Sequence, residues 1–330
     1  MKAIFLGDKR TINQVYTPFA REKLCEKLDI NTSVIFSKDD LATNDLKDTE
    51  YIFSTWGMPS LTDEEIKTNL PSLKAVFYAA GTVKGFAKPF LNCDIRIFSA
   101  AAANAIPVAE VTLAQILLAT KGFFHHTALG KKHIAELKKN VNDYCGNMRA
   151  KIGVIGAGAI GKLVIEKLTG FDNEVLVFDP FLTEEQISSL GGKKATLKKI
   201  FSECIVISNH LADKEETKGI LNYSLFSLMP KNAVFLNTGR GAQVNESDLV
   251  RALAEDKSRI AILDVTHPEP PEENHPFYTM DNIILTPHFA GSSGNEVERM
   301  AIFMIDEFER VKNGVAPLYE VTIEMLERMA

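Results

Sequence analysis

A glycine-rich segment near the middle of the chain constrains the fold more than any other feature. An apolar run at 151–155 leads into Gly156-Ala157-Gly158-Ala159-Ile160-Gly161, and a helix-like run follows at 162–168. In a βαβ unit with this spacing, the first glycine permits a tight turn and the second lets the backbone approach a pyrophosphate. The third allows the helix to pack closely on the strand. The N–H groups at the helix N-terminus then favour phosphate groups, so the segment predicts a dinucleotide site.

The next strand-like run, at 174–178, ends in Asp179. An acidic residue at this position can accept hydrogen bonds from the adenosine ribose, and an ordinary glycine-rich turn would not require one. Asp179 would also repel a 2′-phosphate, and Pro180-Phe181-Leu182 offers no arginine to bind one. The sequence therefore favours NAD over NADP. Because the motif begins at mid-chain rather than at the N-terminus, FAD is disfavoured as well.

Length and composition limit the class of protein. The chain has 330 residues, 45% hydrophobic and 24% charged, with a net charge of −6, which suits two globular domains. The acidic balance and scattered lysines predict no nucleic-acid partner. We expect that no apolar run reaches the roughly 18–20 residues needed to span a bilayer, and therefore no membrane partner. The four cysteines lack C-x-x-C spacing and indicate reduced thiols and a cytoplasmic location.

The order of elements predicts an α/β fold with two parallel-sheet domains, both Rossmann-like or flavodoxin-like. Strand-like and helix-like runs alternate up to about residue 98 and again from 151 to 285. Between these regions we expect a long apolar helix at 104–120, with Pro107 in its first turn, and a second helix at about 125–140. A final helix at 295–313 would return to the first domain. We therefore predict a substrate domain formed by 1–98 and 290–330, with a cofactor domain, 99–289, inserted into it and an active site in the cleft between them.

Three polar residues follow apolar strands of the second half, at the sheet edge where ligands of open α/β sheets bind. They are Arg240 in Thr238-Gly239-Arg240-Gly241, Glu269 in a proline-rich loop after Asp264, and His288 in Thr286-Pro287-His288. Alone, each could be a surface or structural residue. Together they suit reversible carbonyl–alcohol chemistry, in which an arginine fixes an α-keto acid and a histidine exchanges a proton with its oxygen. A carboxylate beside the histidine would fix its tautomer.

At this point the chain resembles the D-isomer-specific 2-hydroxyacid dehydrogenases, which include phosphoglycerate dehydrogenases and glyoxylate/hydroxypyruvate reductases. The resemblance rests on the glycine motif with Asp179, on Asn237-Thr238-Gly239-Arg240-Gly241, on Leu263-Asp264-Val265 with Glu269-Pro270, and on Leu285-Thr286-Pro287-His288. It implies an oxidoreductase that interconverts a small 2-keto acid and its D-2-hydroxy acid with NAD. Members are usually dimers through the cofactor domain, so a homodimer is expected.

The resemblance also implies residue roles. Arg240 would bind the substrate carboxylate and polarise the keto group, His288 would be the acid/base, and Glu269 would be its partner. Asp264 would bind the nicotinamide carboxamide. The remaining cofactor contacts would be His210, Thr238 and Gly239, and the remaining substrate contacts would be Ala80, Gly81, Thr82 and Asn104.

The sequence leaves several alternatives open. The substrate loop reads Gly81-Thr82-Val83-Lys84-Gly85 where the family commonly has an Asp-Asn pair, so Lys84 could bind a second anionic group or simply face solvent. Trp56 could face the cleft or serve packing alone. No metal site is expected, since the pair His125-His126 lacks nearby carboxylates. A NAD(H)-sensing binding protein of the corepressor type, with little turnover, is the alternative function. The substrate and the physiological direction do not follow from the sequence.

Overall fold

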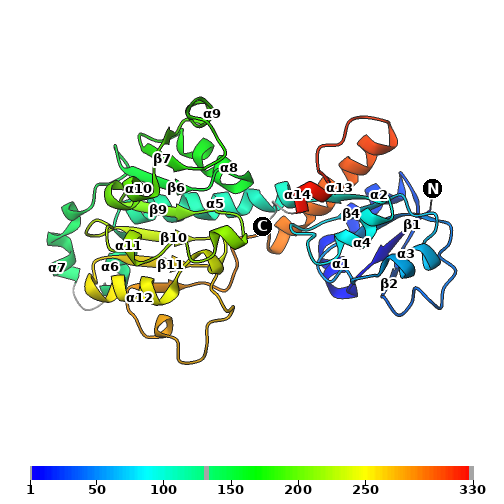
Figure 1. Ribbon diagram of the computed structural model, residues 1–330, viewed down its shortest axis with the longest axis horizontal. Helices are drawn as coiled ribbons and strands as arrows, with labels where there is room; N and C mark the ends of the chain where they lie inside the picture. Colours follow the sequence, from blue (N-terminus) through cyan, green and yellow to red (C-terminus); the bar gives the residue numbers. More distant parts are fainter. Residues whose placement is uncertain (1, 130–133, 327–330) are drawn as a thin grey trace. The chain divides into compact units, whose positions relative to one another are not determined.

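The computed structural model describes residues 2–129 and 134–326 and divides the chain into two compact units. Unit 1 consists of Met1–Asn104 and Ser292–Ala330, and unit 2 consists of Ala105–Gly291. Each unit has its own sheet with helices beside it (Figure 1). The predicted pair of parallel-sheet α/β domains is confirmed. The two junctions lie at 104/105 and 291/292, a few residues after the positions expected from the sequence.

The sheet of unit 1 has six strands in the order β13-β5-β4-β3-β1-β2. All its pairings are parallel except the one between β13 and β5. The strands are β1 (Lys2–Leu6), β2 (Asp29–Phe36), β3 (Thr49–Ser54), β4 (Ala75–Tyr78), β5 (Arg96–Ser99) and β13 (Glu320–Val321). The helices of this unit are α1 (Lys9–Val15), α2 (Pro18–Cys25), α3 (Asp63–Asn69), α4 (Ala87–Asn92), η5 (Gly294–Glu296), α13 (Val297–Lys312) and α14 (Ile323–Leu326).

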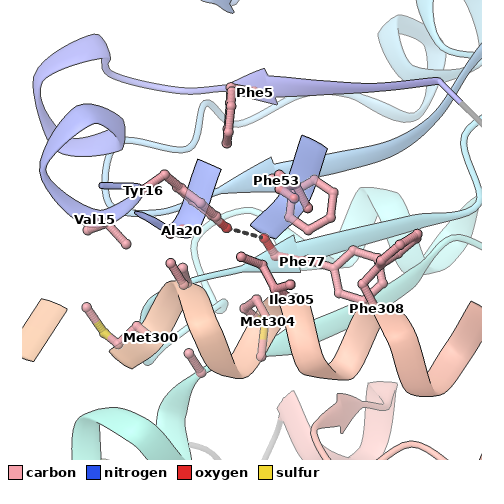
Figure 2. Close-up of a cluster of buried hydrophobic side chains, with 14 of the residues drawn as sticks. Phe5, Val15, Tyr16, Ala20, Phe53, Phe77, Met300, Met304, Ile305 and Phe308 are labelled. Atoms are coloured by element: carbon pink, nitrogen blue, oxygen red, sulfur yellow. Dashed lines mark hydrogen bonds between the residues drawn. The ribbon is translucent and has the colours of Figure 1, made fainter. Parts of the chain in front are cut away.

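The last long helix of the chain, α13, packs on this first sheet. Phe308 of α13 makes edge-to-face contacts with Phe53 and Phe77, at centroid distances of 5.8 and 5.5 Å. Met300, Met304 and Ile305 of the same helix join this core cluster, and Figure 2 shows Ile305 and Phe308 on the side of the helix that faces the strands. Since each large apolar side chain buried this way contributes roughly 1.5–3 kcal/mol, α13 is an integral part of unit 1. The predicted return of the C-terminal helix to the first domain is confirmed.

The antiparallel strand β13 was not expected from the sequence. Its Glu320 accepts hydrogen bonds from Arg96 of β5, with Nε–Oε1 and Nη2–Oε2 distances of 2.7 and 2.8 Å. The buried carboxylate of Glu307 on α13 accepts from the backbone N–H groups of Leu318 and Tyr319 and so fixes the approach to the strand. A strand of two residues has no detectable periodicity, which is why only the structure reveals it.

The sheet of unit 2 has seven strands in the order β12-β11-β10-β9-β6-β7-β8, all parallel. They are β6 (Lys151–Ile155), β7 (Glu174–Phe178), β8 (Lys193–Lys194), β9 (Val206–Asn209), β10 (Val234–Asn237), β11 (Ile260–Leu263) and β12 (Ile283–Leu285). The helices are α6 (Phe123–Leu129), α7 (Ile134–Lys139), η1 (Val141–Asp143), α8 (Ala159–Leu168), α9 (Glu184–Ser189), α10 (Leu197–Glu203), η2 (Glu215–Thr217), α11 (Tyr223–Phe226), η3 (Gly241–Gln243), α12 (Glu246–Glu255) and η4 (Pro276–Tyr278). The strand order reverses beside β6, and ligands of open α/β sheets bind at such a point.

Helix α5 (Ala101–Thr120) corrects two expectations. It begins three residues before Asn104, so that Pro107 lies inside the helix rather than in its first turn. By length and composition it is also apolar enough to cross a membrane, contrary to the expectation that no run reaches this length. Its Ala109, Ile116 and Ala119 belong to the buried core of unit 2, which accounts for the apolar composition. The cytoplasmic location stays a prediction.

The helix expected at 125–140 falls on α6 and α7, and residues 130–133 between them lie outside the described residues. The four cysteines, Cys25, Cys93, Cys145 and Cys204, are free thiols, as the sequence predicted.

Candidate active site

The glycine-rich turn after β6 has the geometry that its spacing predicts. Gly156 has a φ of +88°, and a Cβ there would lie 2.7 Å from the carbonyl oxygen of His210. A Cβ on Gly161 would lie 2.0 Å from the carbonyl oxygen of Gly156, so a side chain would separate helix α8 from the turn. At Gly158 a Cβ would meet nothing within 4 Å, which leaves open space over the N-terminus of α8. This helix has Gly158 as its N-cap, with no side-chain hydrogen bond to its first N–H groups. The turn is therefore a cradle suited to a phosphate group.

Asp179 joins the end of β7 to this cradle. Its Oδ2 accepts a hydrogen bond from the Ala157 N–H at 2.9 Å, and its Oδ1 accepts from the N–H groups of Phe181 and Leu182 at 2.9 and 3.1 Å. A carboxylate has about four lone-pair directions, so capacity remains for a ribose hydroxyl. Asp179 thus has a structural task in addition to the predicted contact with a ribose.

His210 lies beside the cradle and is buried. Its Nε2 is 2.8 Å from the Ser208 hydroxyl, and its Nδ1 is buried with no hydrogen-bond partner among the residues that the structure describes. Burial lowers its pKa to about 3, so the ring is neutral at ordinary pH. An unpartnered buried nitrogen next to an open phosphate cradle fits a site that a nucleotide completes.

A buried network of amide side chains shapes the turn that carries Arg240. The Asn209 amide donates to Asn237 Oδ1 at 3.0 Å and to Gln243 Oε1 at 2.8 Å. Asn237 accepts from the Gly239 N–H and donates to the Arg240 carbonyl, and Gln243 Oε1 accepts from the Arg240 N–H. Because Asn209, Asn237 and Gln243 are all fully buried, each lost bond would leave a polar group without water. The backbone around Arg240 is therefore held in one conformation.

The guanidinium of Arg240 is half-buried and makes one hydrogen bond to its own turn, from Nη1 to the Gly239 carbonyl at 2.8 Å. Its remaining N–H groups make no hydrogen bond within residues 2–129 and 134–326, so they are available to a planar anion. Thr238, just before it, is buried and lies 3.1 Å from the Thr112 hydroxyl of α5. Gly239 is close-packed too, since a Cβ there would lie 3.0 Å from the Asn209 carbonyl oxygen.

Glu269 is positioned by the loop that follows β11. Gly241 follows Arg240 in the preceding turn, and a Cβ on it would lie 2.0 Å from the carbonyl carbon of Thr266 in this loop. The loop therefore packs directly on the turn of Arg240. The Thr266 hydroxyl donates to the Pro268 carbonyl at 2.8 Å, and the His267 N–H donates to Glu246 of α12 at 2.8 Å. Burial raises the pKa of the Glu246 carboxyl. The loop is thus fixed on both sides before it reaches Glu269.

His288 and Glu269 form a direct pair. The distance from His288 Nδ1 to Glu269 Oε1 is 2.7 Å, and both side chains are about half exposed, at 49% and 43%. The bond occupies Nδ1, which leaves Nε2 to exchange a proton with a ligand. His288 also has a φ of 53°, a left-handed conformation that is uncommon for a residue with a side chain.

Asp264 holds the segment that carries His288. Its Oδ1 accepts from the Thr286 hydroxyl at 2.6 Å and from the Phe289 N–H at 3.0 Å, and its Oδ2 accepts from the Ala290 N–H at 3.0 Å. The sequence pointed to Asp264 only as a contact for nicotinamide. It did not reveal this hold on the loop, nor the parts played by Asn209, Gln243 and Thr286.

The candidate substrate residues of unit 1 also come together. The Ser99 hydroxyl donates to the carbonyl oxygens of Ala80 and Gly81 at 3.1 and 2.5 Å. A Cβ on Gly81 would lie 3.9 Å from Asn104 Nδ2, and Asn104 Oδ1 accepts from the Ser292 N–H at 2.9 Å. Thr82 is exposed at the tip of the same loop.

The structure also gives the surroundings of Trp56 and Lys84, two residues of unit 1 whose roles the sequence left open. Trp56 is 37% exposed and follows β3, and its carbonyl accepts from the Thr11 hydroxyl at 2.6 Å. Lys84 is exposed beyond Thr82. Over residues 2–129 and 134–326, no three histidine, cysteine or acidic side chains gather in a way that could hold a metal ion.

The fold and the site together define a nucleotide-binding protein of two α/β domains. The sequence model for the NAD-binding domain of D-isomer-specific 2-hydroxyacid dehydrogenases matches residues 113–290. The chain therefore belongs to the D-isomer-specific 2-hydroxyacid dehydrogenase family, and the predictions of the family and of NAD as cofactor are confirmed.

Individual relatives agree with this assignment. A D-3-phosphoglycerate dehydrogenase of Methanocaldococcus jannaschii is 32% identical over 67% of this chain and 42% of its own length. A formate dehydrogenase of Neurospora crassa is 30% identical over 78% of this chain and 72% of its own. The crystal structure of a phosphoglycerate oxidoreductase from Rhizobium etli superposes with a TM-score of 0.78 at 21% identity, covering 98% of this chain and 99% of the other. The chain spans about half the length of the first curated relatives that it matches.

Proposed function

We propose that the protein is an NAD-dependent oxidoreductase that interconverts a small 2-keto acid and its D-2-hydroxy acid. The pair of His288 and Glu269, 2.7 Å apart beside the turn of Arg240, is the observation that carries this proposal. With Nδ1–H directed at the Glu269 carboxylate, His288 Nε2 is the atom that gives a proton to the keto oxygen during reduction and removes it during oxidation. By accepting from Nδ1–H, Glu269 holds the ring in one tautomer and one orientation.

Arg240 has the chemistry to bind the substrate carboxylate and polarise the adjacent keto oxygen. Its guanidinium presents a planar set of donors, which suits two oxygens at once. The buried network around Asn237 and Gln243 fixes the backbone of this turn before substrate arrives. A preorganised donor of this kind stabilises negative charge that develops on the keto oxygen.

The cofactor domain supplies the other half of the reaction. When bound, NAD provides or accepts the hydride at the substrate carbon. The N–H groups at the start of α8 would hold its pyrophosphate, and Asp179 would accept from its ribose. We also assign His210, Thr238 and Gly239 to the cofactor pocket, and Ala80, Gly81, Thr82 and Asn104 to the substrate.

Formate is a less suitable substrate for this set of residues, although one relative is a formate dehydrogenase. Removing a hydride from formate gives carbon dioxide directly and transfers no proton to or from an oxygen atom. A histidine that is poised by a carboxylate would then have no task in the reaction. The pairing of His288 with Glu269 therefore favours a keto acid or hydroxy acid.

The test is the rate of NADH oxidation with a panel of 2-keto acids, measured for the wild type, His288→Ala and Glu269→Gln. We expect His288→Ala to lower kcat/KM by roughly 10²–10⁴-fold, the usual contribution of a general acid, and Glu269→Gln to lower it less. Glu273→Gln is the matched control, because Glu273 is an exposed carboxylate in the same loop. If His288→Ala turned over at the wild-type rate, the proposal would be wrong. Tight NADH binding with no turnover on any keto acid would instead favour the NAD(H)-sensing alternative.

We further propose that the protein is a homodimer through unit 2. Among the described residues of this unit, nine large apolar side chains are more than a third exposed, and five of the nine fall between residues 118 and 148: Leu118, Phe123, Ile134, Val141 and Met148. Exposed apolar residues gathered in one stretch are typical of a subunit contact. Light scattering on a size-exclusion column should give twice the chain mass for the wild type and less for a variant with Ile134→Asp and Met148→Asp. A monomeric wild type would contradict this proposal.

A further inference from the structure

We infer that Asp264 is the positioning residue for His288, and that it acts by holding the segment Thr286–Ala290 in place. This inference rests on the proposed function of His288 as the acid/base. Asp264 does not contact the imidazole itself. It accepts three hydrogen bonds from residues on both sides of the histidine, namely Thr286, Phe289 and Ala290.

The backbone at His288 explains why such a hold is needed. With a φ of 53°, His288 occupies a left-handed conformation that a residue with a Cβ adopts only when its surroundings require it. The hydroxyl before it and two N–H groups after it converge on one carboxylate. Because both flanks are tied to the same side chain, the chain must turn sharply between them, and the imidazole projects from that turn toward Glu269.

The carboxylate is well placed to act as a rigid anchor. Asp264 directly follows β11 and is 3% exposed, and its own N–H donates to the Asn237 carbonyl of the next strand at 3.0 Å. The Thr286 N–H donates to the carbonyl of Leu263, the residue before Asp264, at 3.0 Å. This backbone bond keeps Thr286 beside the carboxylate that its hydroxyl contacts. An ionised acceptor inside the protein makes stronger hydrogen bonds than a neutral one, which favours an aspartate over an asparagine here.

This role differs from the contact with the nicotinamide carboxamide that the sequence implied. Three of the roughly four lone-pair directions of the carboxylate are already used by the loop, two on Oδ1 and one on Oδ2. A single direction remains for a ligand. Removing the Thr286 hydroxyl would weaken the hold on the loop while leaving that free direction untouched, and this separates the two roles experimentally.

The experiment compares Thr286→Val, Thr286→Ser and Asp264→Asn in the full-length protein. NADH affinity is measured by fluorescence titration, and kcat and KM are measured with the best keto acid over a range of pH. We expect kcat to fall about tenfold in Thr286→Val and about a hundredfold in Asp264→Asn, with the NADH Kd of Thr286→Val within about twofold of wild type. Thr286→Ser keeps the donor and should recover most of the loss. Thr279→Val is the control, since the Thr279 hydroxyl bonds only its own turn at Pro276.

The split between kcat and KM, with the rescue by Thr286→Ser, gives the readout that a merely structural role would not move. When the loop is loosened, the His288 ring spends less time in the position from which it exchanges a proton with the substrate, so kcat should fall in Thr286→Val while KM stays close to wild type. Wild-type kcat in Thr286→Val would overturn the inference. So would an Asp264→Asn variant whose only defect is weaker NADH binding. Full activity in His288→Ala would mean instead that the proposed function itself is wrong.

Discussion

Gly241 and Thr266 approach so closely that a Cβ on the glycine would lie 2.0 Å from the threonine carbonyl carbon. Gly241 follows Arg240, and Thr266 begins the loop that leads to Glu269. This contact, together with the buried amides behind Arg240 and the carboxylate of Asp264, means that the Arg240, Glu269 and His288 segments are packed or hydrogen-bonded to one another within unit 2. Backbone contacts therefore set much of the geometry of the site.

Gly241→Ala should test this backbone contact. The added methyl group must push the two loops apart, so we expect a loss of about 1–3 kcal/mol in the free energy of unfolding and a fall in kcat larger than the loss of fold explains. Urea unfolding and steady-state kinetics measure the two effects. Gly170→Ala serves as a control, because the nearest atom to a Cβ there is 3.7 Å away. Equal behaviour of the two variants would argue against a tight contact at Gly241.

Arg240→Lys keeps the charge but removes the planar set of donors. A lysine ammonium cannot bind two oxygens in a fixed plane, so we expect KM for the keto acid to rise at least tenfold and kcat to fall as well. The NADH Kd should stay close to wild type, since the backbone network around Asn237 and Gln243 does not use the guanidinium. A lysine variant with unchanged kinetics would remove Arg240 from the proposed mechanism.

Asp179→Ser should alter both the affinity for cofactor and the choice of cofactor. Removing the carboxylate lifts the repulsion of a 2′-phosphate, so the preference for NADH over NADPH should narrow by roughly 10–100-fold. The Ala157 N–H also loses its acceptor, so the NADH Kd should rise. Both constants are read from fluorescence titrations with the two cofactors. A variant that kept the full preference for NADH would show that selectivity arises elsewhere.

The buried ring of His210 should make stability depend on pH. Its pKa is lowered by burial to about 3, from an ordinary value of 6.5, so the folded state holds the neutral ring. Below pH 6.5 the unfolded chain takes up a proton that the folded protein does not. The contribution of His210 to the free energy of unfolding is therefore fully present above pH 6.5 and is lost as the pH falls toward 3. Between pH 7.5 and 5.5 the expected loss is about 1.4 kcal/mol.

Urea unfolding at these two pH values measures the effect. His210→Gln should be less stable than wild type at both values, but its change between them should be smaller by about this amount. His125, whose pKa burial also lowers, stays in both proteins and contributes equally. An identical pH dependence in the two proteins would mean that His210 titrates normally.

Short-range features of the fold were predictable from the sequence. The three glycines of the cradle lie within six residues, and the close approach of Gly161 to the Gly156 carbonyl follows from local backbone geometry. The pairing of His288 with Glu269 was expected from resemblance to a family rather than from the spacing of the two residues. The hold of Asp264 on Thr286 and the bond from Asn209 to Gln243 were not predictable, because they join positions 22 and 34 residues apart. Such bonds depend on the register of neighbouring strands and on turn conformations that one sequence does not reveal.

The packing of α13 on the first sheet has a consequence for how the protein is made. The ribosome synthesises β1 to β5 early. The residues of α13 that complete their core, including Phe308, are synthesised only after the whole of unit 2. Unit 2 is one continuous segment, so it can finish folding while the chain is still attached. The earlier strands meanwhile expose Phe53 and Phe77 to solvent or to a chaperone. We therefore expect the cofactor unit to mature first during translation, although more than a hundred residues precede it.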